Sequence, residues 1–139
     1  MSFTRFGFAA AASAAVLSGC AMLYPDPKES LSPELRTALD TPLICKGEAE
    51  CKLMWERGIY YVANNSRWQM VAQTSNLIET DSVPRGSPHL SYSITREPLG
   101  GGSYRIATQA WCGGSERFCK PNAPEAIARA KLYMRTGQR

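Results

Sequence analysis

The sequence predicts an α+β domain, a small antiparallel sheet of about four strands with two helices packed on one face, in the order helix, strands, helix. Apolar residues recur at helical spacing in residues 48–63 and again in residues 123–137. Between these segments apolar and polar residues alternate, as they do in strands. A sheet covered by helices on one face would bury both helical stripes.

The first helix is predicted over residues 48–63 and should end at the polar residues 64–66. Cys51, Trp55, Ile59 and Val62 form one apolar stripe, and the charged residues fall largely away from it. A stripe with an aromatic residue can line a ligand site, but at this spacing it is more often part of the core. We therefore interpret it as core.

Four strands are expected to follow. Residues 68–73 alternate, a turn at 74–76 follows, and residues 77–80 resume a short strand. Residues 90–97 and 104–112 alternate cleanly and predict a hairpin with one solvated face. The three glycines that join these strands lack the following Lys-Ser/Thr of a phosphate-binding loop, so a hairpin turn is the better interpretation.

The second helix is predicted over residues 123–137. Pro124 stands near its start, where proline is tolerated, and Gly137 stands at its end. The apolar side should carry Ala126, Ile127, Ala130 and Met134.

Four cysteines in the domain predict structural disulfides. We expect the local pairs Cys45–Cys51 and Cys112–Cys119, although the four cysteines also allow two crossed pairings. The loop-entropy model assigns each short loop roughly 2–2.5 kcal/mol of stabilisation. Zinc binding is the alternative, but these cysteine spacings differ from those of zinc knuckles, and we expect no metal.

The N-terminus predicts export and lipid attachment. An apolar run over residues 6–17 follows Arg5; it is shorter than the roughly 20 residues of a membrane span and fits a secretory signal. The run ends in Leu17-Ser18-Gly19-Cys20, which resembles the bacterial lipobox. The resemblance implies that Cys20 receives a diacylglyceryl group and that the signal is cut before it. Acylation of the new amino group would complete a durable anchor. An ordinary signal peptide that happens to contain Cys20 is the alternative.

The chain accordingly divides into a lipoprotein signal peptide over residues 1–19, the lipidated Cys20 with a flexible tether over residues 20–40, and a single domain over residues 41–139. Prolines among polar residues make the tether segment typical of extended chain. A short helical turn at 33–39, capped by Ser32, is an alternative for part of it.

The expected membrane location and the net charge of the protein limit the kinds of partner that it can bind. In lipoproteins an Asp after the lipidated cysteine often retains the protein in the inner membrane; here Ala21 follows, which favours the outer membrane, facing the periplasm. The formal charge of +4 becomes +3 once residues 1–19, with Arg5, are removed, and the basic residues are scattered. We expect no nucleic-acid partner.

No motif in the chain predicts catalysis. His89 is the single histidine, and no nucleophile elbow is present. Glu79 and Asp81 could form an acid–base pair in principle, but a solvated strand end is the simpler interpretation. We expect no catalytic residue and no cofactor.

The cysteine and aromatic framework of residues 43–135 resembles that of small proteobacterial lipoproteins without an assigned activity. The resemblance implies a lipid-anchored envelope protein and supplies no reaction. We therefore expect a non-catalytic interaction or accessory module with an envelope protein as partner. The alternative is a small-ligand or glycan binder; an envelope hydrolase is the third interpretation. The aromatic side chains available to a ligand would be Trp68, Tyr92, Tyr104 and Trp111.

Overall fold

The computed structural model describes residues 25–138, so the signal peptide and Cys20 lie outside the described residues. In chain order the elements are α1 (Pro33–Asp40), β1 (Leu43–Lys46), α2 (Glu48–Asn65), β2 (Met70–Gln73), β3 (Leu77–Thr80), β4 (Ser91–Gly100), β5 (Ser103–Trp111), the 3-10 helix η1 (Glu116–Phe118) and α3 (Ala123–Thr136).

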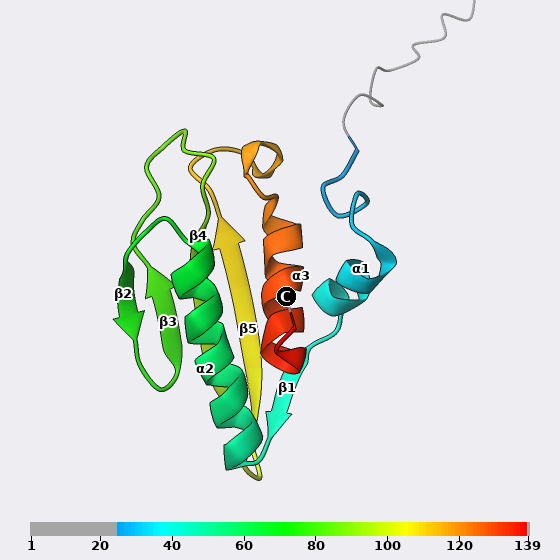
Figure 1. Ribbon diagram of the computed structural model, residues 1–139, viewed down its shortest axis with the longest axis vertical. Coiled ribbons are helices and arrows are strands. Elements are labelled where there is room, and N and C mark those ends of the chain that lie inside the picture. Colours follow the sequence, from blue (N-terminus) through cyan, green and yellow to red (C-terminus); the bar gives the residue numbers. More distant parts are fainter. Residues whose placement is uncertain (1–24, 139) are drawn as a thin grey trace, which may run out of the picture.

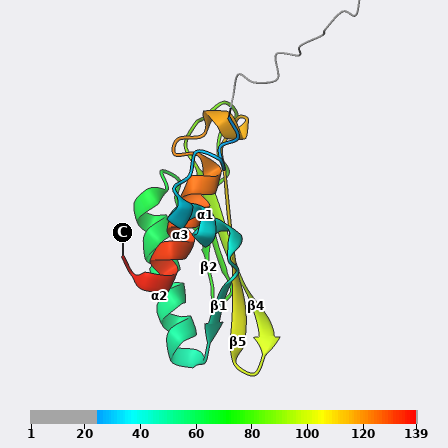
Figure 2. The same ribbon diagram turned by 90° about the vertical axis from the view of Figure 1, so that its right-hand side faces the viewer.

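The predicted α+β class is confirmed: an antiparallel five-stranded sheet has the strand order β1-β5-β4-β3-β2. Helices α2 and α3 cover one face of the sheet, and α1 lies beside α3 (Figures 1 and 2). Strand alternation therefore sends every second side chain towards the helices. Within the part of the chain described, no helix has the length and hydropathy needed to cross a membrane.

The prediction of about four strands and two helices, in the order helix, strands, helix, is wrong in its detail. The structure has a further helix and a further strand, α1 and β1, before α2. Strand β1 is four residues long, and its sequence Leu-Ile-Cys-Lys does not alternate between apolar and polar residues. It forms because Leu43 and Cys45 are buried while it pairs with β5, some sixty residues further along the chain.

Helix α1 also revises the tether assigned to residues 20–40. Leu31 and Ala38 are buried, and α1 packs against α3, so this part of the segment belongs to the fold. The cap expected at Ser32 is confirmed, since its hydroxyl oxygen accepts from the Leu35 amide at 3.3 Å. The composition of this segment is typical of extended chain, because a helix of only eight residues has few apolar positions that could reveal its buried side.

A buried lysine joins α1 to α3. The Nζ of Lys131 donates to the Leu39 carbonyl at 2.6 Å, which satisfies a backbone oxygen at the end of α1. Burial lowers the pKa of Lys131, with a smaller lowering from Arg135 and an opposing contribution from Asp40.

The core lies between the sheet and the two long helices. Helix α2 approaches α3 and the sheet closely at Gly58, where a Cβ would lie 3.0 Å from the Met134 sulfur and 3.5 Å from Ile78 Cδ1. Glycine is needed here for space, and the neighbouring Ile94 is fully buried.

Both expected disulfides are present. Cys45–Cys51 ties β1 to the first turn of α2, with the Cα atoms 5.0 Å apart. Cys112–Cys119 closes the loop between β5 and α3, with the Cα atoms 5.5 Å apart. These cysteines are therefore engaged in disulfides and do not act as zinc ligands in this state.

Two loops are joined at one end of the sheet. The Gly113 amide donates to the Ser87 carbonyl at 2.9 Å, and the Gly86 amide donates to the Gly113 carbonyl at 2.8 Å. A Cβ at Gly113 would lie 1.9 Å from the Pro84 carbonyl oxygen, so these two backbones meet only because residue 113 has no side chain.

Replacing Gly113 should therefore destabilise the domain. We expect Gly113→Ala to lower the free energy of unfolding by about 1–3 kcal/mol, the usual range for overpacking. Gly114→Ala is the matched control, because its Cβ would meet nothing closer than Phe118 Cβ at 3.9 Å. Urea unfolding followed by tryptophan fluorescence measures both; equal stability of the two variants would contradict the loop contact.

Candidate functional site

An arginine occupies a position that strand alternation assigns to the core. Along β4, Tyr92 and Ile94 face the helices and are buried, and Arg96 follows them in the same phase, opposite Ile106 of β5. The Arg96 guanidinium lies 5.5 Å from the centroid of the Trp55 ring and 4.5 Å from that of Tyr104. Both distances fit cation–π contact, which fixes the orientation of the guanidinium.

The Arg96 side chain has no acceptor among the described residues. Its Nε is buried without a hydrogen-bond partner, and no carboxylate of residues 25–138 forms an ion pair with it. Arginine carries five N–H donors and keeps its charge at any physiological pH. A half-buried guanidinium that contacts two aromatic rings and has no acceptor among the described residues is suited to an external anion.

Arg96 borders an open pocket of about 650 Å³. The residues that line it come from residues 48–59 of α2, the β2–β3 turn and the β4–β5 hairpin, which lie towards the same end of the molecule (Figure 1). It is lined by Glu48, Cys51, Lys52, Trp55, Glu56, Ile59, Gln73, Thr74, Ser75, Arg96, Gly102 and Tyr104. Hereafter this is the Arg96 pocket.

The walls of the Arg96 pocket are held by contacts of their own. The Trp55 indole N–H donates to the Thr74 carbonyl at 3.0 Å, which joins α2 to the β2–β3 turn. The Cys45–Cys51 disulfide holds the start of α2 against β1. Little ordering is therefore required of Trp55 when a ligand binds, which favours affinity.

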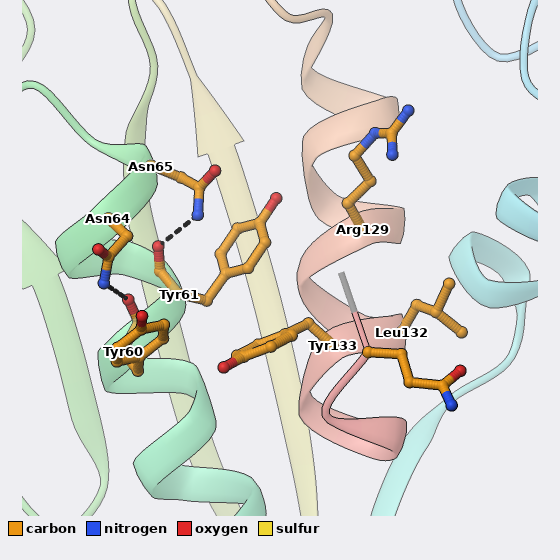
Figure 3. Close-up of a pocket in the computed structure, with 8 residues that line it drawn as sticks. Tyr60, Tyr61, Asn64, Asn65, Arg129, Leu132 and Tyr133 are labelled. Atoms are coloured by element: carbon orange, nitrogen blue, oxygen red, sulfur yellow. Dashed lines mark hydrogen bonds between the residues drawn. The ribbon is translucent and has the colours of Figure 1, made fainter.

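A second cavity, of about 320 Å³, lies between α2 and α3. Three tyrosine rings line it: Tyr133 lies 6.1 Å from Tyr60 and 5.9 Å from Tyr61 between ring centroids (Figure 3). Asn64, Asn65, Arg129, Leu132 and Gln138 complete the lining. We call it the tyrosine groove.

Several polar groups of the tyrosine groove are already engaged. The side-chain amides of Asn64 and Asn65 donate to backbone carbonyls one helical turn earlier, at 2.7 Å and 2.8 Å (Figure 3). Arg129 pairs with Glu125 at 2.8 Å. The groove therefore presents aromatic surface more than available charge, and the Arg96 pocket is the stronger candidate for recognition of an ion.

The four aromatic residues expected to bind a ligand do not line one site. Tyr92 is buried in the core, with 1 % of its surface exposed, and Tyr104 lines the Arg96 pocket. Trp111 is half-buried at the end of β5, in the strand phase that faces away from the helices. Trp68 is half-buried in the loop after α2, and its indole N–H has no partner among the described residues.

The residues considered for catalysis form no hydrogen-bonded group among the described residues. Nη1 of Arg67 lies 2.9 Å from Nε2 of His89, so this ring nitrogen accepts from the guanidinium. An Asp81 oxygen accepts from the Ser82 amide at 2.7 Å, and Glu79 lies on β3. Within residues 25–138 neither carboxylate forms a hydrogen bond or ion pair with His89.

Sequence reasoning missed Arg96. The signal was present: in residues 90–97 the apolar phase runs Leu90, Tyr92, Ile94 and then reaches an arginine. A cation in the buried phase of a strand needs a partner, and this one has two aromatic rings.

Two tyrosines should resist ionisation in the folded state. Burial raises the pKa of Tyr61 to about 12, opposed by the nearby Arg129 and assisted by Glu125. Burial also raises the pKa of Tyr92, with a smaller contribution from Tyr61. Both phenols are therefore protonated at neutral pH.

Because the folded state holds these protons more tightly, their contribution to stability is complete below about pH 10 and is lost as the pH rises towards 12. We expect Tyr61→Phe to reduce the fall in unfolding free energy over this range. Phenolate absorbance of the wild type and of Tyr61→Phe should differ by one phenol, and the difference should appear well above pH 10. A difference that appears near pH 10 would contradict this assignment.

Comparison of the chain with protein-family models gave no match, nor did comparison with curated proteins or with solved structures. Function is therefore inferred from the side-chain geometry and from the motif at Cys20.

Proposed function

We propose that this protein is a lipid-anchored, non-catalytic binding module of the bacterial cell envelope, whose Arg96 pocket takes a carboxylate-bearing segment of an envelope protein. The observation that carries the proposal is the Arg96 guanidinium, which lies beside two aromatic rings and has no acceptor among the described residues.

Arginine suits a carboxylate because its planar fork can donate two parallel hydrogen bonds to the two oxygens. Stacking on Trp55 and Tyr104 restricts the fork before the ligand arrives, so less entropy is lost on binding. The Ser75 hydroxyl of the β2–β3 turn borders the same pocket and offers a further hydrogen bond.

The charges around Arg96 favour a polypeptide over a polyanion. Glu48 and Glu56 line the pocket beside Lys52, which lies 4.0 Å from Glu56. A ligand with many negative charges would be repelled by the glutamates, whereas a segment with one carboxylate among neutral or basic groups would complement this mixture. The pocket is also bordered by α2, a turn and a hairpin, which together offer a surface of the kind that a protein segment contacts.

Attachment to the membrane is supported by the lipobox Leu17-Ser18-Gly19-Cys20. With Ala21 after the cysteine, the proposal places the protein at the outer membrane, facing the periplasm. Among the described residues the His89 ring accepts from Arg67 and bonds to neither Glu79 nor Asp81, which supports a binding role over hydrolysis.

A second candidate function is small-ligand or glycan binding in the tyrosine groove. The observation that favours it is the pair of stacked rings, Tyr60 and Tyr133, since Tyr60 is 46 % exposed and an aromatic face can pack against a sugar. Loss of glycan binding in Tyr60→Ala, with retention in Arg96→Met, would assign the function to this groove.

Position-specific photo-cross-linking in intact cells tests the protein-partner proposal. A photoreactive residue at Ser75, which borders the Arg96 pocket, should give one dominant protein adduct. The same residue at Ser82, another exposed serine in the loop between β3 and β4, is the matched control and should not. Equal capture from both positions would contradict the proposal.

Arg96→Met retains an unbranched side chain against the rings and removes the charge. We expect about a 10- to 100-fold loss of affinity for the partner identified, the range for a charge-assisted hydrogen bond. Arg105→Met is the control, because this exposed arginine pairs with Glu97 on the surface at 3.6 Å, and we expect affinity to be unchanged. Unchanged affinity of Arg96→Met, with normal thermal unfolding, would overturn the role of Arg96.

Lipid attachment has its own test. Mass spectrometry of the mature N-terminus should find an acylated residue at Cys20, and Cys20→Ser should release the protein into the soluble envelope fraction. An unmodified N-terminus would contradict the anchor.

A further inference from the structure

The loop closed by Cys112–Cys119 exposes a large apolar side chain. Phe118, at the end of η1, is 70 % exposed, the highest fraction among the exposed large apolar residues described. Its position is supported on both sides, because the disulfide closes the loop and the Lys120 amide donates to the Pro88 carbonyl at 2.8 Å. A supported loop thus presents a phenyl ring to its surroundings.

The described chain begins beside this loop. Asp26 and Pro27 line one cleft, of about 490 Å³, together with residues 115–117. Two views at right angles show the start of the described chain and η1 at the same end of the molecule (Figures 1 and 2).

Little chain separates this point from the site of lipid attachment. Cys20 precedes Pro25 by five residues, which span at most about 18 Å when fully extended. The β4–β5 hairpin turn lies at the other end of a ten-residue strand, about 30 Å away along the sheet. A lipid on Cys20 would therefore tether the disulfide-loop end of the molecule to the bilayer, and the hairpin lies at the far end from this tether.

The charges near Phe118 also suit a lipid surface. Arg85, Arg117 and Lys120 are exposed at this end, against Asp26 and Glu116. Basic side chains around an apolar anchor favour anionic head groups.

We infer that the Cys112–Cys119 loop is a membrane-facing surface, with Phe118 inserted between the head groups of the bilayer that holds the lipid anchor. This inference rests on the lipid attachment proposed above and adds an orientation to it. The Arg96 pocket, at the opposite end, then faces away from the membrane towards a partner.

Depth-dependent fluorescence quenching tests the inference on the full lipidated protein. It is placed in vesicles of phosphatidylethanolamine and phosphatidylglycerol, with brominated acyl chains in one of two otherwise identical preparations. Phe118→Trp and Leu99→Trp each add one tryptophan to the same three native ones, at opposite ends of the molecule. Both positions are exposed, so both variants should fold.

We expect the added tryptophan at 118 to be quenched by brominated lipid about two-fold or more beyond the wild-type background, because an inserted side chain reaches roughly 5–10 Å into the interface. The added tryptophan at 99 should not be quenched.

Vesicle flotation and the mass of the N-terminus test lipid attachment separately from orientation. A protein that floats and carries lipid but shows equal quenching at both positions, or none at 118, would overturn the orientation alone. A protein that lacks the lipid and does not float would overturn the anchor, and the orientation with it.

Discussion

The packing of two helices on one face of the β4–β5 hairpin is the constraint on which the rest of the structure depends. Because α2 and α3 cover a single face, alternate residues of β4 and β5 face the helices, and Tyr92, Ile94 and Ile106 among them are buried in the core. The helices can approach this face closely because Gly58 has no side chain to separate α2 from Met134 and Ile78. The disulfide to β1 and the lysine bond to α1 then attach the outer elements to this core.

The same constraint produces the Arg96 pocket. The alternation that buries Tyr92 and Ile94 continues along β4 to residue 96. There the side chain is charged, and it packs against the rings of Trp55 and Tyr104 in place of aliphatic side chains. An arginine held in this way is a poor choice for stability alone, since its buried Nε–H loses water without gaining an acceptor. Binding of an anion from the pocket would give the guanidinium charge a partner, which is why we place recognition here and not in the tyrosine groove, where Arg129 is already paired.

Much of the fold was predictable because its signals are local. The stripe of α2, the alternation of β4 and β5, and the proline and glycine near the ends of α3 each lie within a short stretch of sequence. The local disulfides were also predictable from cysteine number and spacing. Strand β1 was not, because its four residues become a strand only by pairing with a distant β5. In β2 the predicted alternation of half-buried and exposed residues is kept, but the register shift between Met70 and Ala72 in its pairing with β3 was not predictable.

The candidate site was less predictable than the fold. The sequence predicts a core position for Trp55 and ligand binding for Tyr104. That both rings contact Arg96 depends on how α2 crosses the sheet, and no local sequence pattern predicts this crossing. The interactions of Trp68, Tyr92 and Trp111 likewise follow from tertiary position. Tyr92, for example, lies edge-on to Tyr61 of α2 at 6.2 Å between ring centroids, inside the core.

The most direct measurement of the central claim is an NMR titration of the arginine Nε–H groups of the ¹⁵N-labelled domain. The probe is an acetylated dipeptide with a free terminal carboxylate, and the same dipeptide with an amidated terminus is its neutral control. The account predicts a saturable shift of the Arg96 resonance with the carboxylate form alone, while the Arg105 resonance stays unchanged. An Arg96 resonance that responds to neither peptide, or equally to both, would contradict a carboxylate-binding pocket at Arg96.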